Sequence, residues 1–518
     1  NGLDHIDRSL YRNWLNHKGR QLKVSFLRKT GDFAKAEALI NDSLAMDKFN
    51  MGCRFESYLI HTLQGNTEAA AAAKAEMKAL MRGAVHSYLE YAIDYASAGM
   101  YEEAAQLLSF VTEENEATYP MVYYALGFFA SKMGKKDEAL NLYKKAETMC
   151  PDYCFPNKLE EVLMLNGAMS LNPEGAKAPY YLGNFHYAAR IYDEAIACWE
   201  KSASIDDTYP TVLRNLSLAY YNKQHNPQKA LATLEKAYNL DTTDARILME
   251  LDQLYKKLRY PHRQRLDFLE AHADVVEQRD DLCIERITLY NQLGEYQKAY
   301  DLINSRKFHP WEGGEGKVTS QYLLCRVELA KIAIREGRFA DAVRLLKETE
   351  KYPDNLGEGK LSMAEENDIH YWMGCAYEGL GEEALAKEYF TKATKGSAEP
   401  AIAFFYNDQQ PDKIFYQGLA WRKLGEEDKA RSRFNRLIKH GEKHLFDKVK
   451  IDYFAVSLPD LLIWDDDLNV RNQIHCNLVM GMGYLGLGDK EQARKFLSEV
   501  ARLDINHQAG KQLLEMCG

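Results

Sequence analysis

The sequence predicts an all-α fold, a right-handed superhelical solenoid of roughly eleven antiparallel helix hairpins with insertions. Three observations support this. The 518-residue chain has only 13 prolines and is rich in Ala, Leu, Glu and Lys, a composition that favours helix. A pattern of small and large residues recurs along the chain at fixed spacing. Between the paired segments lies a short turn that usually contains a glycine, such as Gly134 or Gly425.

The clearest copies of the pattern cover residues 123–152, 179–207, 370–396, 414–441 and 477–504. In each copy a glycine is followed twelve residues later by an alanine: Gly127/Ala139, Gly183/Ala195, Gly374/Ala386, Gly418/Ala430 and Gly481/Ala493. A large apolar residue comes four positions after each alanine: Tyr143, Trp199, Phe390, Phe434 and Leu497. We expect two helices to approach closely at the small residues. The large residue then fills the space towards the neighbouring hairpin.

This pattern resembles the tetratricopeptide repeat, which has small residues, an alanine and an aromatic at the same spacing. Looser copies share the register, with the pairs Val24/Ala36, Ala92/Ala104 and Ala330/Ala342. The resemblance implies an α-solenoid that acts as a scaffold for protein–protein interaction. It implies no catalytic residues, so we expect the chain not to be an enzyme.

The stretch "GMGYLGLG" (481–488) satisfies the G-x-G-x-x-G pattern of dinucleotide-binding loops. Such a loop must follow a buried strand, whereas the preceding "RNQIHCNLVM" (471–480) has the character of a helix. We therefore interpret the stretch as the end of a first helix and its turn, and we predict no cofactor.

Three stretches interrupt the repeat period. Residues 151–178 predict one extra helix, 306–318 a Gly-rich loop, and 442–473 an irregular insertion rich in aromatic and β-branched residues. We expect two halves of one solenoid: an N-terminal half over 1–305 and a C-terminal half over 306–518.

The second half carries a further resemblance through "HPWEGGEG", "YPDNLGEGKL", "ENDIHYWMG", "YNDQQPDKIFYQGLA" and "IDYFAVSLPDLL". About 300–518 is similar to the tetratricopeptide region of large bacterial proteins that carry an N-terminal β-rich domain of unknown function. The resemblance implies that such a domain is missing from this chain and suggests a link to carbohydrate. The chain begins with Asn1 rather than Met, which fits a fragment or a processed protein.

The first helices of such hairpins line the concave face of the solenoid. Aromatic, amide and basic residues there suit a protein or peptide segment, bound from another chain or from the chain's own missing domain. The alternative is that some of these tyrosines only pack between repeats. The predicted peptide groove comprises Tyr124, Phe128, Tyr180, Asn184, Tyr187, Arg214, Tyr221 and Asn222.

The second half offers a more polar groove. Carboxylates and aromatics together suit sugar hydroxyls and ring faces, so a glycan site is the alternative function. The competing interpretation is that Asp and Asn residues in loops form turns and helix caps. The predicted polar groove comprises Trp311, Asp368, Tyr371, Asp412 and His475, with Glu312, Asn407 and Asp408 in nearby loops.

Bulk properties limit the partners. The net charge of −10 disfavours nucleic acid and anionic membranes, and no apolar run approaches the roughly 20 residues of a membrane span. The nine cysteines lack the spacing of a disulfide framework or a metal site, so we expect a reducing, cytoplasmic setting, with a processed or exported form left open. "WDDDLN" (464–469) alternates acidic residues but lacks the Gly and Glu of a calcium loop, and we interpret it as a solvated helix start.

Overall fold

The computed structural model describes residues 2–113, 119–311, 313–362, 364–401, 410–450 and 463–518. Over these ranges it contains 28 α-helices, one short 3-10 helix and no strand, so the predicted all-α class is confirmed. Glu312, Asn407, Asp408 and the "IDYFAVSLPDLL" segment (451–462) lie outside the described residues.

Contacts between Cα atoms divide the chain into two compact units, Asn1–Val212 and Leu213–Gly518. The halves that the sequence predicts, 1–305 and 306–518, stay a prediction. The helices of unit 1 are α1 (Gly2–Arg12), α2 (His17–Lys29), α3 (Phe33–Met46), α4 (Met51–Leu63), α5 (Thr67–Met81), α6 (Val85–Ser97), α7 (Tyr101–Thr112), α8 (Met121–Lys132), α9 (Lys136–Glu147), α10 (Leu159–Leu171), α11 (Lys177–Ala188) and α12 (Tyr192–Ile205).

Helix α13 (Pro210–Asn222) contains the division between the units. Unit 2 continues with α14 (Pro227–Leu240), α15 (Ala245–Lys257), α16 (His262–Glu270), α17 (Ala273–Val276), α18 (Asp280–Gln292), α19 (Tyr296–Asn304), α20 (Lys317–Arg335), α21 (Phe339–Lys347), η1 (Asp354–Leu356), α22 (Asn367–Gly379), α23 (Glu383–Ala393), α24 (Pro411–Lys423), α25 (Glu427–His444), α26 (Leu468–Leu487), α27 (Lys490–Leu503) and α28 (Gln508–Met516).

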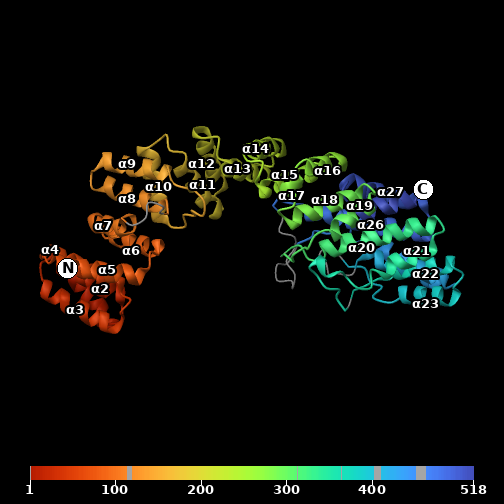
Figure 1. The fold of residues 1–518 in the computed structure, drawn as a ribbon, viewed down its shortest axis with the longest axis horizontal. Helices are drawn as coiled ribbons and strands as arrows, with labels where there is room; N and C mark the ends of the chain where they lie inside the picture. Colours follow the sequence, from red (N-terminus) through yellow and green to blue (C-terminus); the bar gives the residue numbers. More distant parts are fainter. Residues whose placement is uncertain (1, 114–118, 312, 363, 402–409, 451–462) are drawn as a thin grey trace. The chain divides into compact units, whose positions relative to one another are not determined.

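Successive helices pair as hairpins within each unit, for example α8 with α9 and α22 with α23 (Figure 1). A glycine on the first helix faces the large residue on the second. A Cβ added at Gly127 would lie 2.5 Å from a ring carbon of Tyr143, and one at Gly374 would lie 2.6 Å from the ring of Phe390. The ring thus lies over the glycine of its own hairpin, a contact that the spacing alone did not predict.

The glycines of "GMGYLGLG" serve helix packing. The first three lie in α26, where a Cβ at Gly481 would meet Leu497 of α27 at 2.6 Å and one at Gly486 would clash with Phe434 of α25. Gly488 ends the helix with φ of +85°, a conformation that glycine adopts without strain. Phe434 therefore contacts the next hairpin, as the repeat pattern predicts, in addition to Gly418 of its own hairpin.

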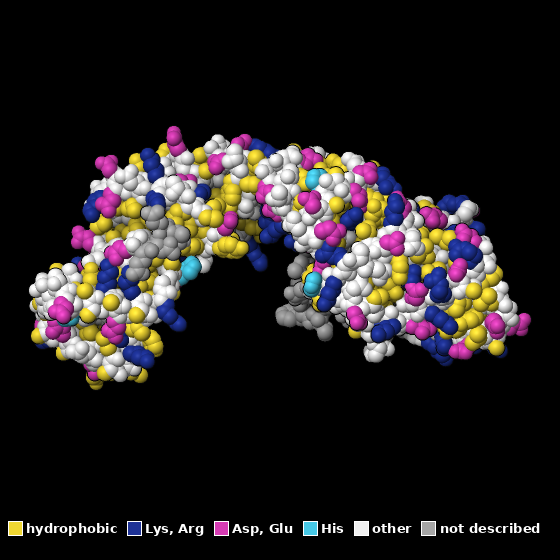
Figure 2. All heavy atoms as spheres, viewed as in Figure 1, with side chains coloured by type: hydrophobic (Ala, Val, Ile, Leu, Met, Phe, Trp, Pro, Cys, Tyr) yellow, Lys and Arg dark blue, Asp and Glu magenta, His cyan; other side chains and the backbone are white. Residues whose placement is uncertain are grey.

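Within the described ranges, no helix is both long and apolar enough to cross a membrane. On the face drawn in Figure 2, Lys and Arg side chains are interspersed with Asp and Glu side chains over both units. This mixed surface means that charge recognition has to be sought in local clusters.

Candidate functional site

Two of the tyrosines predicted for the peptide groove of unit 1 are buried. Tyr124 on α8 is 0% exposed and Tyr180 on α11 is 5% exposed. The hydroxyl of Tyr124 donates to Glu147 at 2.7 Å, and burial raises its pKa well above the usual range, so it remains a donor. In this conformation both rings pack between helices, which is the alternative that the sequence left open.

Phe128, Asn184 and Tyr187 are partly exposed. The side-chain oxygen of Asn184 accepts a hydrogen bond from the indole N–H of Trp199 at 3.1 Å. The ring of Tyr187 lies 5.2 Å from that of Trp199. Their part in binding a partner stays a prediction.

The predicted groove residues of unit 2 lie on α13, next to α15. Arg214 binds Glu250 through two nitrogens, at 2.6 and 2.5 Å, and Arg246 adds a third contact at 3.0 Å. Glu250 is 0% exposed, and two arginines compensate its buried charge. This ion pair joins α13 to α15.

Asn222 at the end of α13 binds the backbone of a segment far away in the sequence. Its amide group donates to the carbonyl oxygen of Ile463 at 2.8 Å, and its side-chain oxygen accepts from the N–H of Asp465 at 2.8 Å. One asparagine thus pairs with a backbone carbonyl oxygen and with a backbone N–H of a segment that has no regular secondary structure. Such bonds hold a backbone without depending on its side chains.

The residue between these two backbone contacts, Trp464, is the buried anchor. It is 1% exposed, and its indole N–H donates to the backbone oxygen of Glu250 at 3.1 Å. The ring packs edge-on against Tyr221, with centroids 5.2 Å apart. Tyr221, predicted to lie in the groove, is therefore a direct neighbour of the buried indole.

Two lysines pair with the acidic residues that follow. Lys223 lies 3.6 Å from Asp465, and Lys257 lies 2.9 Å from Asp466. All four side chains keep part of their surface in solvent, so each pair contributes little energy but favours acidic residues at these positions. We call the groove of Tyr221, Asn222, Lys223, Glu250 and Lys257 the α13–α15 groove.

Sequence reasoning missed Trp464, Lys223, Lys257 and Glu250 as members of this site. The available signal was a tryptophan directly before an acidic run, in a stretch interpreted as a helix start. That interpretation holds for Asp467, which caps α26 by accepting from the N–H of Asn469 at 2.8 Å.

The polar groove of unit 2 brings several predicted residues together on α22 and α24. Lys413 lies 2.5 Å from Asp368 and 3.3 Å from Asp412. Burial and the neighbouring Asp368 raise the pKa of Asp412, although Lys413 opposes this. For Lys413, burial lowers the pKa, but the two carboxylates outweigh it and keep the lysine charged.

Aromatic side chains adjoin this carboxylate–lysine cluster. The ring centroids of Tyr371 and Tyr416 lie 5.5 Å apart, and the indole N–H of Trp372 donates to the Tyr416 hydroxyl at 3.3 Å. Lys331 lies over the Trp372 ring at 5.2 Å. Lys413, Trp372, Tyr416 and Lys331 were not predicted.

Trp311 and His475, also predicted for the polar groove, have other neighbours. Trp311 packs against Gly314 in the 306–318 loop. The ring of His475 lies 6.0 Å from that of His440, and burial lowers the pKa of His475 to about 4. The assignment of both residues to a glycan site stays a prediction.

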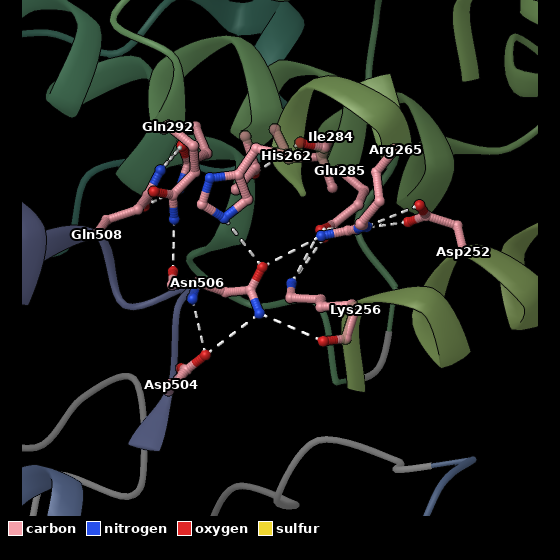
Figure 3. Close-up of polar contacts among 12 residues, drawn as sticks. Asp252, Lys256, His262, Arg265, Ile284, Glu285, Gln292, Asp504, Asn506 and Gln508 are labelled. Atoms are coloured by element: carbon pink, nitrogen blue, oxygen red, sulfur yellow. Dashed lines mark hydrogen bonds and ion pairs between the residues drawn. The ribbon is translucent and has the colours of Figure 1, made fainter. Parts of the chain in front are cut away.

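A second segment near the C-terminus docks on the same part of unit 2 (Figure 3). The turn between α27 and α28 places Asn506 beside α15, α16 and α18. Its side-chain oxygen lies 3.2 Å from His262 and accepts from Arg265 at 3.3 Å, while its backbone oxygen accepts from Gln292 at 2.5 Å. Arg265 in turn binds buried Asp252 at 2.7 Å.

Helical hairpins in series define the class of protein: an all-helical α-solenoid. Tetratricopeptide-repeat family models match residues 122–153, 368–395 and 414–440. These ranges coincide with the hairpins α8–α9, α22–α23 and α24–α25. The predicted tetratricopeptide repeats are therefore confirmed over these ranges, and the further resemblance of about 300–518 to large bacterial proteins stays a prediction.

Several solved structures are similar to part of the chain. They include MamA from Desulfovibrio magneticus RS-1, with 16% identity over 38% of this chain and 97% of that one, at a TM-score of 0.22. The pilF protein of Pseudomonas aeruginosa shows 19% identity over 43% and 90%, at 0.26. YrrB, described as a tetratricopeptide-repeat protein with an unusual peptide-binding site, shows 15% identity over 47% and 95%, at 0.17.

Proposed function

We propose that this chain is a non-catalytic scaffold that binds a protein or peptide segment in its concave surface, with the α13–α15 groove as the binding site. The observation that carries the proposal is the pair of hydrogen bonds from Asn222 to the backbone of residues 463 and 465. Repeat proteins that bind peptides have to recognise a chain without secondary structure, and a side-chain amide does this through both of its polar atoms.

The rest of the groove has the properties of a peptide site. Recognition of peptides relies on a few buried aromatic anchors surrounded by weaker polar contacts. Tyr221 and the Glu250 backbone oxygen form an anchor pocket, and Lys223 and Lys257 form its charged rim. The partner segment belongs either to another protein or to the β-rich domain that the bacterial resemblance implies.

Photo-crosslinking from the groove tests this proposal. A photoreactive phenylalanine analogue replaces Tyr221, and the chain is irradiated in native extract. The same analogue at Gln228, an exposed position on α14, is the matched control. We expect a protein that crosslinks from position 221 and not from position 228. Identical crosslinked species from both positions would contradict the proposal.

The second candidate function is glycan binding by the polar groove. The observation that favours it is the convergence of Asp368 and Asp412 on Lys413 beside Trp372 and Tyr416. Carboxylates and aromatic faces are the groups that hold sugars. A saccharide screen by thermal shift tests it, with Asp368→Asn and Asp412→Asn against Asp428→Asn, an exposed residue of α25. A shift that both groove variants retain would contradict the assignment.

A further inference from the structure

Residues 463–466 lie in the α13–α15 groove in the manner of a bound ligand. The hydrogen bond from Asn222 to Ile463 spans 241 positions in the sequence. The segment has neither helical nor strand structure, and it contributes one buried side chain, Trp464, and two partly exposed acids. An anchor with a polar, accessible rim is typical of reversible recognition and not of a permanent core.

Unit 2 does not depend on this segment to hold its C-terminal helices in place. The turn between α27 and α28 makes separate bonds to α16 and α18 through Asn506 (Figure 3). Lys511 adds a bond to the backbone oxygen of Gln292 at 2.5 Å. These contacts adjoin the ion pair of Arg265 and Asp252, both 1% exposed. Release of Trp464 therefore leaves a buried junction intact.

We propose that residues 463–466 are an intramolecular ligand of the α13–α15 groove, and that the partner displacing them carries an aromatic residue followed by two carboxylates. This inference rests on the proposed scaffold function and names the chemistry of the partner segment. The tryptophan pocket selects the aromatic residue, Asn222 holds the backbone around it, and Lys223 and Lys257 select the acids.

A tethered ligand lowers the apparent affinity of a competing one. Tethering gives the internal segment an effective concentration on the order of millimolar. The apparent affinity of an outside peptide falls in proportion to the fraction of chains whose groove is free. Weakening the internal segment should therefore strengthen binding of an outside peptide, a result that a purely structural tryptophan would not give.

The test is a fluorescence-anisotropy titration with a labelled peptide, IWDDDLN, which copies residues 463–469. Trp464→Ala in the full chain frees the groove, and we expect it to bind the peptide at least tenfold more tightly than the unaltered chain. The matched control is Phe446→Ala, because Phe446 is 84% exposed in the same unit. It should bind like the unaltered chain. A peptide with Ala in place of Trp should not bind to any variant.

A second variant is needed in case Trp464→Ala partly unfolds the chain. The double variant Asp465→Lys and Asp466→Lys changes solvent-accessible side chains and sets them against Lys223 and Lys257, so it should also release the segment and raise peptide affinity. Adding Asn222→Ala to it should abolish the gain.

The inference is overturned if either variant keeps the circular dichroism of the unaltered chain and binds the peptide no more tightly. That result leaves the scaffold proposal standing, because crosslinking from position 221 judges the scaffold proposal independently.

Discussion

In the hairpins with the clearest repeat pattern, a glycine on the first helix contacts an aromatic ring on the second. These contacts fix the register of the repeat at the level of single residues. Gly127 faces Tyr143, and Gly374 faces Phe390, at distances that leave no room for a Cβ. The alanines on the second helices are buried as well, with Ala139 0% and Ala386 5% exposed. The residues that the spacing selected are therefore those at the contact between the two helices.

Enlarging one of these alanines should destabilise the fold. Ala386→Leu adds atoms to a filled contact, and we expect a loss of about 1–3 kcal/mol in the free energy of unfolding. Ala384→Leu, on an exposed position of the same helix, is the control and should change little. Urea unfolding followed by circular dichroism measures both. Equal stability of the two variants would mean that the register is wrong.

His475 should make the stability depend on pH. Burial, together with nearby His440, lowers its folded-state pKa from 6.5 to about 4. The unfolded chain thus binds the proton first, and stability is lost as the pH falls from about 6.5 towards 4. The shift corresponds to at most about 3 kcal/mol.

Replacing the histidine removes this dependence. His475→Gln should lose less stability between pH 7 and pH 4.5 than the unaltered chain, as measured by urea midpoints at the two values. His225→Gln, at an exposed site, should behave like the unaltered chain. A parallel pH dependence for all three proteins would show that His475 titrates normally.

At the scale of helices and segments, periodicity predicts which residues share a face but not which distant segment covers them. Tyr221 and Asn222, which the sequence predicts to lie in a groove, both contact the segment at 463–465. Their neighbour Trp464 lies more than two hundred residues away in sequence, and its indole bond to Glu250 spans 214 positions. No local pattern encodes that contact. The sequence around the acidic run after Trp464 therefore predicts only the start of a helix.

The length of the tyrosine side chain explains why two residues of the predicted peptide groove are buried. Tyr124 and Tyr180 occupy first-helix positions, but a tyrosine side chain is long enough to reach between helices. Tyr124 reaches Glu147 on α9, and the Tyr180 ring packs edge-on against Tyr209. Helical position alone does not decide between a ring that faces solvent and one that turns inward.

The turn between α27 and α28 gives an element-scale prediction. Asn506→Ala removes the side-chain oxygen that accepts hydrogen bonds from His262 and Arg265. The two donors are left unpaired and partly buried, which should lower the free energy of unfolding by about 1–3 kcal/mol. We expect faster hydrogen exchange in α28 and α16. Asn141→Ala, an exposed residue of α9, should leave that exchange unchanged. Unchanged exchange in both variants would show that the junction does not hold these helices.

For the molecule as a whole, the repeated small–large pattern was sufficient to predict an all-helical solenoid, because every copy carries the same packing requirement. The contacts through Trp464 and Asn506 close over long sequence distances within unit 2, and the repeated pattern does not reveal them. Our central proposal is that the α13–α15 groove is a peptide site and that the chain's own segment fills it.

Hydrogen exchange at the amide of Asp465 tests that claim most directly, because this N–H donates to Asn222. The measurement is made on the unaltered chain, alone and with an excess of the IWDDDLN peptide. We predict slow exchange in the chain alone and faster exchange when the peptide displaces the segment. Exchange that is fast from the start, or that stays slow in saturating peptide, would contradict the account.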